Sequence, residues 1–128
     1  MSYYFNKSLN TTFDNAIERV TAELQKSGFG ILTEIDVKAT MKKKLDIDFR
    51  NYKILGACNP PFAYKALTAE DKIGTMLPCN VIVQEITPNQ IEVAAIDPVA
   101  SMMAIKNPEL GELALDVRAM LQKVIENL

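Results

Sequence analysis

Two long helical segments, one near each end of the chain, each carry a single apolar stripe, and this pattern constrains the fold most. Apolar residues recur at helical spacing over residues 11–28 and again over 108–128. The stripes consist of Phe13, Ala16, Ile17, Val20 and Leu24, and of Leu110, Leu113, Ala114, Val117, Leu121, Val124 and Leu128. A helix with one apolar side must bury it against another layer, and one face of a β-sheet can cover both helices.

The segments between these helices predict that sheet. Strands are expected over residues 3–9, 29–37 and 51–57 and, rich in Val and Ile, over 80–86 and 91–96. Short helices are expected over 60–71 and over 37–45, where we expect Val37, Met41 and Leu45 to be buried. The order β-α-β-α-β-α-β-β-α predicts an α+β fold, a largely antiparallel sheet covered by helices. The sequence contains no repeat or linker, so we expect one domain over residues 1–128.

Local signals place the ends of the helices. Thr11 or Thr12 is expected to cap the first helix, Asp36 the second, Asn59 the third and Asn107 the last, because short polar side chains accept hydrogen bonds from free N–H groups there. Gly28 is the expected left-handed stop of the first helix.

Charge and hydropathy exclude several partners. The chain has 14 basic and 16 acidic residues, a net charge of −2, whereas a nucleic-acid binder usually shows a basic face. The only basic run, Lys42–Lys44 with Lys38, is flanked by acidic residues and is typical of a solvated helix face. No segment is apolar for long enough to span a membrane, and the first residues do not resemble a secretory signal. We therefore expect no nucleic acid, no membrane association and a cytoplasmic location.

Absent residue types narrow the chemistry. The chain has no histidine, which excludes histidine-based catalysis and the usual histidine-containing zinc sites. The two cysteines are 21 positions apart, too far for a C-x-x-C redox motif, and two thiolates do not complete a zinc site. We expect no metal site, and no pattern identifies a cofactor.

The two cysteines nevertheless sit in similar settings, "GACNPPFAY" at 56–64 and "LPCNV" at 77–81. Cys58 ends one predicted strand and Cys79 precedes another. If these strands are antiparallel and adjacent or next but one, which we favour, both cysteines lie at one edge of the sheet. If they are parallel, the cysteines are separated by roughly 15 to 20 Å. The helix that begins at Pro60 would point its positive end toward Cys58, where it could lower the thiol pKa or bind an anion.

Three interpretations of these motifs stay open. The cysteines can be small core residues, with Asn59 a cap and Asn80 a turn residue. They can instead mark a ligand pocket, or the thiols can be reactive. The predicted ligand-binding residues are Cys58, Asn59, Pro60, Cys79 and Asn80.

The same motifs resemble a prokaryotic family known as domain of unknown function 302. The residues that carry the resemblance are Gly56, Ala57, Cys58, Asn59, Pro60, Ala66, Leu67, Leu77, Pro78, Cys79, Asn80, Val81, Asp97 and Pro98, with Gly28, Phe29 and Ile31 before the second strand. The resemblance covers nearly the whole chain. It implies a curved sheet covered by helices, resembling the TATA-binding-protein-like class, in which homodimers are common, and it implies no activity.

The sequence therefore predicts a small-molecule or anion-binding module, as a homodimer, with its site near the paired Cys-Asn motifs. One alternative is a thiol-dependent enzyme or redox sensor. Another is a structural or interaction protein in which the motif residues only shape the fold. The sequence leaves open whether the protein is an enzyme.

Overall fold

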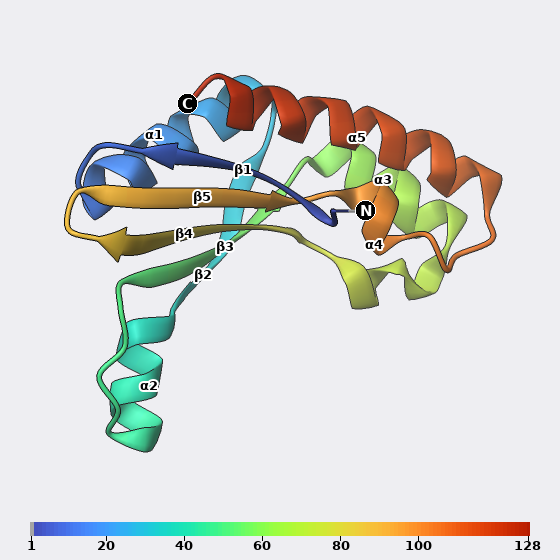
Figure 1. Cartoon of the computed structure of the whole chain (residues 1–128). Helices are drawn as coiled ribbons and strands as arrows, with labels where there is room; N and C mark the ends of the chain where they lie inside the picture. The colour runs from blue at the N-terminus through green and yellow to red at the C-terminus, as the bar shows by residue number, and fades with distance from the viewer. Residues whose placement is uncertain (1) are drawn as a thin grey trace.

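A five-stranded antiparallel sheet, in the order β1-β5-β4-β3-β2, forms the centre of the computed structural model, which describes residues 2–128 (Figure 1). In chain order the elements are β1 (Tyr4–Leu9), α1 (Phe13–Lys26), β2 (Gly30–Asp36), α2 (Val37–Leu45), β3 (Tyr52–Cys58), α3 (Pro60–Ala69), the 3-10 helix η1 (Asp71–Met76), β4 (Cys79–Thr87), β5 (Gln90–Ile96), α4 (Pro98–Ser101) and α5 (Pro108–Glu126). The predicted α+β class and the predicted order of strands and helices are confirmed. The short elements η1 and α4 are additions.

Three of the predicted caps hold helix ends in place. The side chain of Thr12 accepts a hydrogen bond from the N–H of Asn15 at 3.1 Å, and Asp36 Oδ1 accepts one from the N–H of Ala39 at 3.0 Å. Asn107 Oδ1 does the same for α5. Gly28 has a φ of +83°, the left-handed conformation expected where α1 ends.

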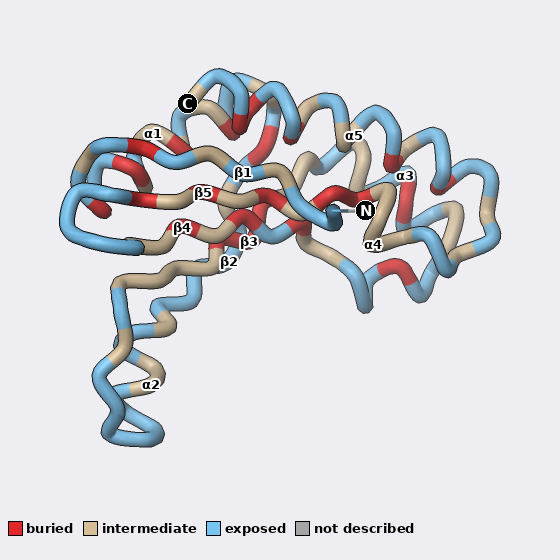
Figure 2. Tube along the Cα trace, in the orientation of Figure 1, coloured by how far each residue is buried: buried red, intermediate tan, exposed pale blue. Residues whose placement is uncertain are grey.

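One face of the sheet forms the main core with α1 and the second half of α5 (Figures 1 and 2). Alternate strand residues point into this core, as expected for a sheet with one covered face. The buried residues include Leu55, Ala57, Val81, Val83, Ile91, Val93 and Ala95 of the sheet, Val20 and Leu24 of α1, and Leu121 and Val124 of α5.

The first half of α5 belongs to a second, smaller core. Its 19 residues make α5 about 28 Å long, whereas a seven-residue strand extends for about 23 Å. The N-terminal half of α5 therefore continues past the sheet and packs on α3 and η1 (Figure 1). Leu110, Ala66 and Ile73 are the buried residues of this second core.

Helix α2 differs from the prediction. None of its residues is buried, and Leu45 is 62% exposed, so the expected burial of Val37, Met41 and Leu45 is wrong. The reason is position, because α2 follows the end of β2 and projects from the body on the side away from α1 and α5 (Figure 1). Periodicity shows that a helix has an apolar side, but not that a layer exists to cover it.

No helix within residues 2–128 combines the length and the apolar character that a membrane span requires.

Gly56 leaves no room for a side chain and provides a test of the fold. It lies in β3 opposite Thr33 of β2 and Asn80 of β4. A Cβ at this position would clash with Thr33 Oγ1 and lie 2.7 Å from Pro78 Cγ. We expect Gly56→Ala to lower the free energy of unfolding by about 1–3 kcal/mol, measured by denaturant titration.

Gly111→Ala is the matched control for this substitution. Gly111 lies inside α5, and a Cβ there would meet nothing within 4 Å. We expect Gly111→Ala to raise stability by up to about 1 kcal/mol, because alanine is the better helix former. Equal effects of the two substitutions would contradict the packing described at Gly56.

Candidate functional site

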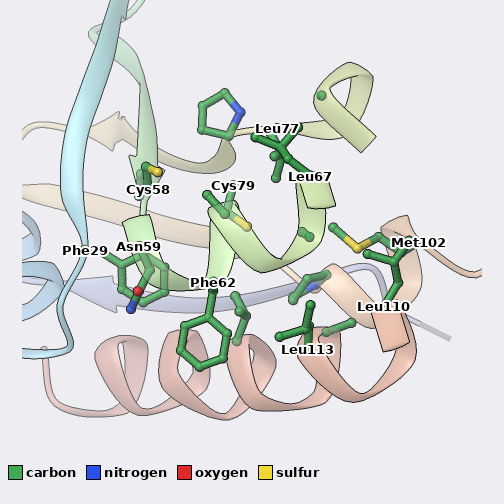
Figure 3. Close-up of a pocket in the computed structure, with 18 of the residues that line it drawn as sticks. Phe29, Cys58, Asn59, Phe62, Leu67, Leu77, Cys79, Met102, Leu110 and Leu113 are labelled. Atoms are coloured by element: carbon green, nitrogen blue, oxygen red, sulfur yellow. The ribbon is translucent and has the colours of Figure 1, made fainter. Parts of the chain in front are cut away.

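A cavity of about 340 Å³ lies where the second core meets the end of the sheet (Figure 3). Its walls come from the ends of β3 and β4, from α3 and η1, from α4 and from the first half of α5. The cavity therefore forms at the place where α5 leaves the sheet and continues over other helices.

The walls of the cavity consist almost wholly of carbon and sulfur. Of the described residues that line it, Asn59 alone has a polar side chain besides the two thiols. Figure 3 labels Phe29, Cys58, Asn59, Phe62, Leu67, Leu77, Cys79, Met102, Leu110 and Leu113. Such walls favour an apolar molecule, because binding would remove apolar surface from water.

Small residues on four elements leave this space open. Ala57 of β3, Ala63 and Ala66 of α3, Gly74 of η1 and Ala114 of α5 all line the cavity. A larger side chain at any of them would occupy volume that is now free. The cavity thus exists because the residues that face one another across it are small, and not because a helix or strand is missing there.

The sheet brings the two cysteines together at one edge, as the antiparallel alternative predicted. Ala57 of β3 lies opposite Cys79 of β4, so Cys58, the next residue of β3, is adjacent to that pair. Both cysteines are free, and both line the cavity. Cys79 is buried and Cys58 is half-buried, so the two thiols differ in their access to solvent.

The two thiols are therefore not chemically equivalent. Burial and, to a smaller extent, the neighbouring Cys58 together raise the pKa of Cys79 to about 11. At neutral pH, Cys79 is consequently a protonated thiol. A thiolate is the form that attacks electrophiles or binds metals, so Cys79 is a poor nucleophile in the folded protein.

Asn59 occupies the N-cap position of α3, but the predicted side-chain cap is wrong. Its side chain forms no capping hydrogen bond. Instead, Asn59 Nδ2 donates to the backbone oxygen of Ser27 at 3.3 Å and lies 3.9 Å from Met120 Sδ. Asn59 thus joins the start of α3 to the end of α1.

Pro60 and Asn80, the other two predicted site residues, lie outside the cavity lining. Pro60 is exposed in the first turn of α3, and Asn80 is exposed on β4 opposite Gly56. The predicted group of five therefore divides, with Cys58, Asn59 and Cys79 at the cavity and the remaining two elsewhere.

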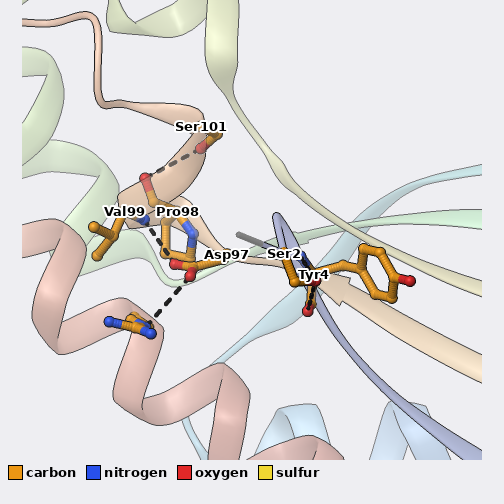
Figure 4. A network of polar contacts seen from close by, with 7 residues as sticks. Ser2, Tyr4, Asp97, Pro98, Val99 and Ser101 are labelled. Carbon is orange, nitrogen blue, oxygen red and sulfur yellow. Dashed lines mark hydrogen bonds and ion pairs between the residues drawn. The ribbon is translucent and has the colours of Figure 1, made fainter.

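A hydrogen-bonded turn fixes the wall formed by α4 (Figure 4). Asp97 is 3% exposed, and its Oδ1 accepts a hydrogen bond from the N–H of Val99 at 3.0 Å. Arg118 Nε of α5 lies 3.4 Å from Asp97 Oδ2. Because Pro98 and Met102 follow Asp97 and line the cavity, this contact holds the wall against α5.

Sequence reasoning missed most of the cavity lining. Leu113 and Val117 were expected to lie in an ordinary helix stripe, and a stripe does not show whether the space that it faces is filled by other side chains. One signal was available in the sequence, since Ala63, Ala66 and Ala114 place small residues on helices that are otherwise lined by large ones.

Comparison with known proteins agrees with this fold. Residues 5–128 match the family described as "Domain of unknown function DUF302". A crystal structure of an uncharacterized conserved protein DUF302 from Bacillus stearothermophilus is similar, with a TM-score of 0.89 and 25% sequence identity, covering 98% of each chain. No curated protein matches the chain. These matches concern family and fold, and neither description states a ligand or a reaction.

The role of Asn59 can be tested by a substitution that removes the hydrogen-bond donor of its side chain and keeps the acceptor oxygen. Asn59→Asp keeps an oxygen that can cap a helix but loses the amide group that bonds Ser27. We expect it to lower the free energy of unfolding by about 1 kcal/mol. Asn80→Asp, the same change in the second Cys-Asn motif, is the control and should be nearly neutral, because Asn80 is exposed and its side chain forms no hydrogen bond within residues 2–128. A neutral Asn59→Asp would instead restore the capping role.

The raised pKa of Cys79 predicts a loss of stability at alkaline pH. Below pH 9, the thiol is protonated in both the folded and the unfolded state and adds no pH dependence. Between pH 9 and about 11, the unfolded state loses this proton first, so stability falls by up to about 3 kcal/mol. Denaturant titrations across this range should show the step in the wild type and in Cys58→Ala. The step should be missing in Cys79→Ala, and its persistence there would contradict the assignment.

Proposed function

Because the chain belongs to the DUF302 family, whose description names no activity, we propose a function from the geometry of the site: the protein binds a small, largely apolar molecule in the cavity beside Cys58 and Cys79. The observation that carries this proposal is a cavity of about 340 Å³ with walls of carbon and sulfur. Its volume falls within the range of small-molecule sites. We also propose that the protein acts as a homodimer.

The energetic basis is the hydrophobic effect. Apolar wall area that stays in contact with water forgoes stabilisation of about 25 cal/mol per Å², and a ligand that covers the wall recovers it. Asn59 adds one polar contact, because its Oδ1 accepts no hydrogen bond from residues 2–128. The favoured ligand is therefore apolar over most of its length and carries a hydroxyl or amide donor at one end.

An anion is a less favourable ligand at this site. Pro60 and Pro61 have no N–H groups, and the N–H of Ala63 already donates to Asn59 O at 2.9 Å. In this first turn of α3, only the N–H of Phe62 is left to meet an anion. Neither the helix terminus nor the apolar walls would compensate for the lost hydration of a charge.

A thiol-dependent enzyme or redox sensor is the alternative. Any such chemistry would have to start at Cys58, the half-buried thiol, since Cys79 stays protonated at neutral pH. A purely structural or interaction protein is the remaining alternative, and it predicts no stabilisation by small apolar molecules.

Thermal unfolding with chemically matched probes tests the proposal. We expect straight-chain alcohols to raise the Tm of the wild type, with an effect that grows with chain length until the cavity is filled. At 100 times the Kd, the ligand should add about 2.7 kcal/mol to the free energy of unfolding. The corresponding carboxylates should bind more weakly, whereas preferential binding of carboxylates would favour the anion-binding alternative.

Two alanine substitutions locate the effect. Ala63→Phe places a ring into the cavity and should abolish the stabilisation by the alcohols. Ala22→Phe makes the same change on an exposed residue of α1, outside the lining, and should leave the stabilisation unchanged. Equal responses of the two variants, or no response of the wild type to any probe, would refute binding in this cavity.

A further inference from the structure

The segment between β2 and β3 forms an exposed arm, residues 37–51, which contains α2 (Figures 1 and 2). Leu45 is 62% exposed and Ile47 is 50% exposed. The main contacts of α2 within the chain are with β2 and β3, the strands that carry it. A helix of nine residues is too short to be stable in water by itself, so the arm needs a surface to pack against.

The arm also differs from the body in charge. Its residues include five basic and two acidic side chains, a net charge of +3, in a chain whose net charge is −2. The rest of the chain therefore carries −5. Lys42 pairs with Asp46 and Asp48, whereas Lys43 and Lys44 form no ion pair within residues 2–128. A cationic arm on an anionic body is complementary to the body of a second copy.

The second face of the sheet, opposite α1 and α5, offers the matching surface. No helix covers this open face in the part of the chain that the structure describes (Figure 1). Cross-strand pairing aligns Ala94, Ile82, Ile54 and Ile35 in one row over β5, β4, β3 and β2. The row is partly exposed, and Ile35 is 48% exposed, so apolar side chains there remain in contact with water.

A polar row lies beside this aliphatic row. Glu92 accepts hydrogen bonds from Asn6 Nδ2 at 3.0 Å and from Gln84 Nε2 at 2.8 Å, and Gln84 Oε1 accepts one from Arg50 Nε at 2.9 Å. The direct partners of Glu92 are therefore uncharged amides. Within residues 2–128 this carboxylate has no ion pair, and a cation from another molecule could reach it on the open face.

We propose that two copies of the chain pair about a twofold axis, each laying its arm on the open face of the other. Leu45 and Ile47 would cover the aliphatic row, and the lysines of the arm would lie near Glu92. Such an interface is closed and reciprocal, so every contact occurs twice. In this dimer, a single partner both supports α2 and covers the open face of the sheet. The proposal does not depend on the ligand cavity, which lies at the end of the sheet beside α3 and the first half of α5.

Sedimentation of the full chain over a range of concentrations tests this pairing. The wild type should be a dimer, and its Kd should rise with salt because the arm and body attract each other by charge. The double substitution Leu45→Asp and Ile47→Asp should give a folded monomer, since both residues are exposed within one chain. Leu115→Asp is the matched control on α5, where Leu115 is 56% exposed, and it should remain dimeric.

A charge exchange distinguishes this interface from other dimers. Lys43→Glu with Lys44→Glu should raise the Kd at least about tenfold, and so should Glu92→Lys alone. Combining all three changes should restore much of the lost affinity. Amide exchange gives an independent readout, because residues 37–45 should be protected in the dimer and lose that protection on dilution.

A wild type that is monomeric at every concentration would overturn the proposal, as would a dimer that neither the arm substitutions nor Glu92→Lys weakens. Circular dichroism of each variant checks that the monomer is folded. Ligand stabilisation through the cavity should persist in the monomeric variant, so failure of the dimer and failure of the binding function are distinguishable.

Discussion

Helix α5 buries the two halves of its apolar stripe against two different partners, and most of the architecture depends on this. Leu121 and Val124 close the main core over the sheet, whereas Leu110 packs on α3 and η1 beyond the sheet's end. The two cores must be bridged where the sheet stops. Alanines and a glycine line the junction between the two cores. Because their side chains are small, the junction is not filled and remains as the cavity.

The paired Cys-Asn motifs serve this junction in different ways. Cys58 and Cys79 end β3 and begin β4, so they form the sheet's contribution to the cavity wall. Asn59 joins the start of α3 to the end of α1 through the backbone oxygen of Ser27. Asn80 points to the open face instead. Similar local sequences thus have unlike surroundings, because one asparagine follows a strand and the other lies within one.

Features that depend on local sequence pattern were predicted correctly. Features that depend on contact with a residue far away in the sequence were not. The stripes, the caps at Thr12, Asp36 and Asn107 and the antiparallel pairing of the cysteine strands follow from spacing and short-range chemistry. Asn59 was misjudged because its partner Ser27 is 32 positions away. The exposure of α2 and the hollow beneath α5 depend on which layers surround a helix, and periodicity carries no information about that.

Strands β3 and β4 connect the two candidate surfaces physically. Alternate side chains of these strands face different surfaces. Ala57 and Cys79 line the cavity, whereas Ile54 and Ile82 lie on the open face. At Gly56 the division breaks down, because the missing side chain lets the ring of Pro78, itself part of the cavity wall, approach Thr33. A side chain on Gly56 would therefore disturb the sheet and the cavity rim together. The glycine in the first Cys-Asn motif and the proline in the second are matched across the sheet, which gives a packing reason for the residues that precede each cysteine.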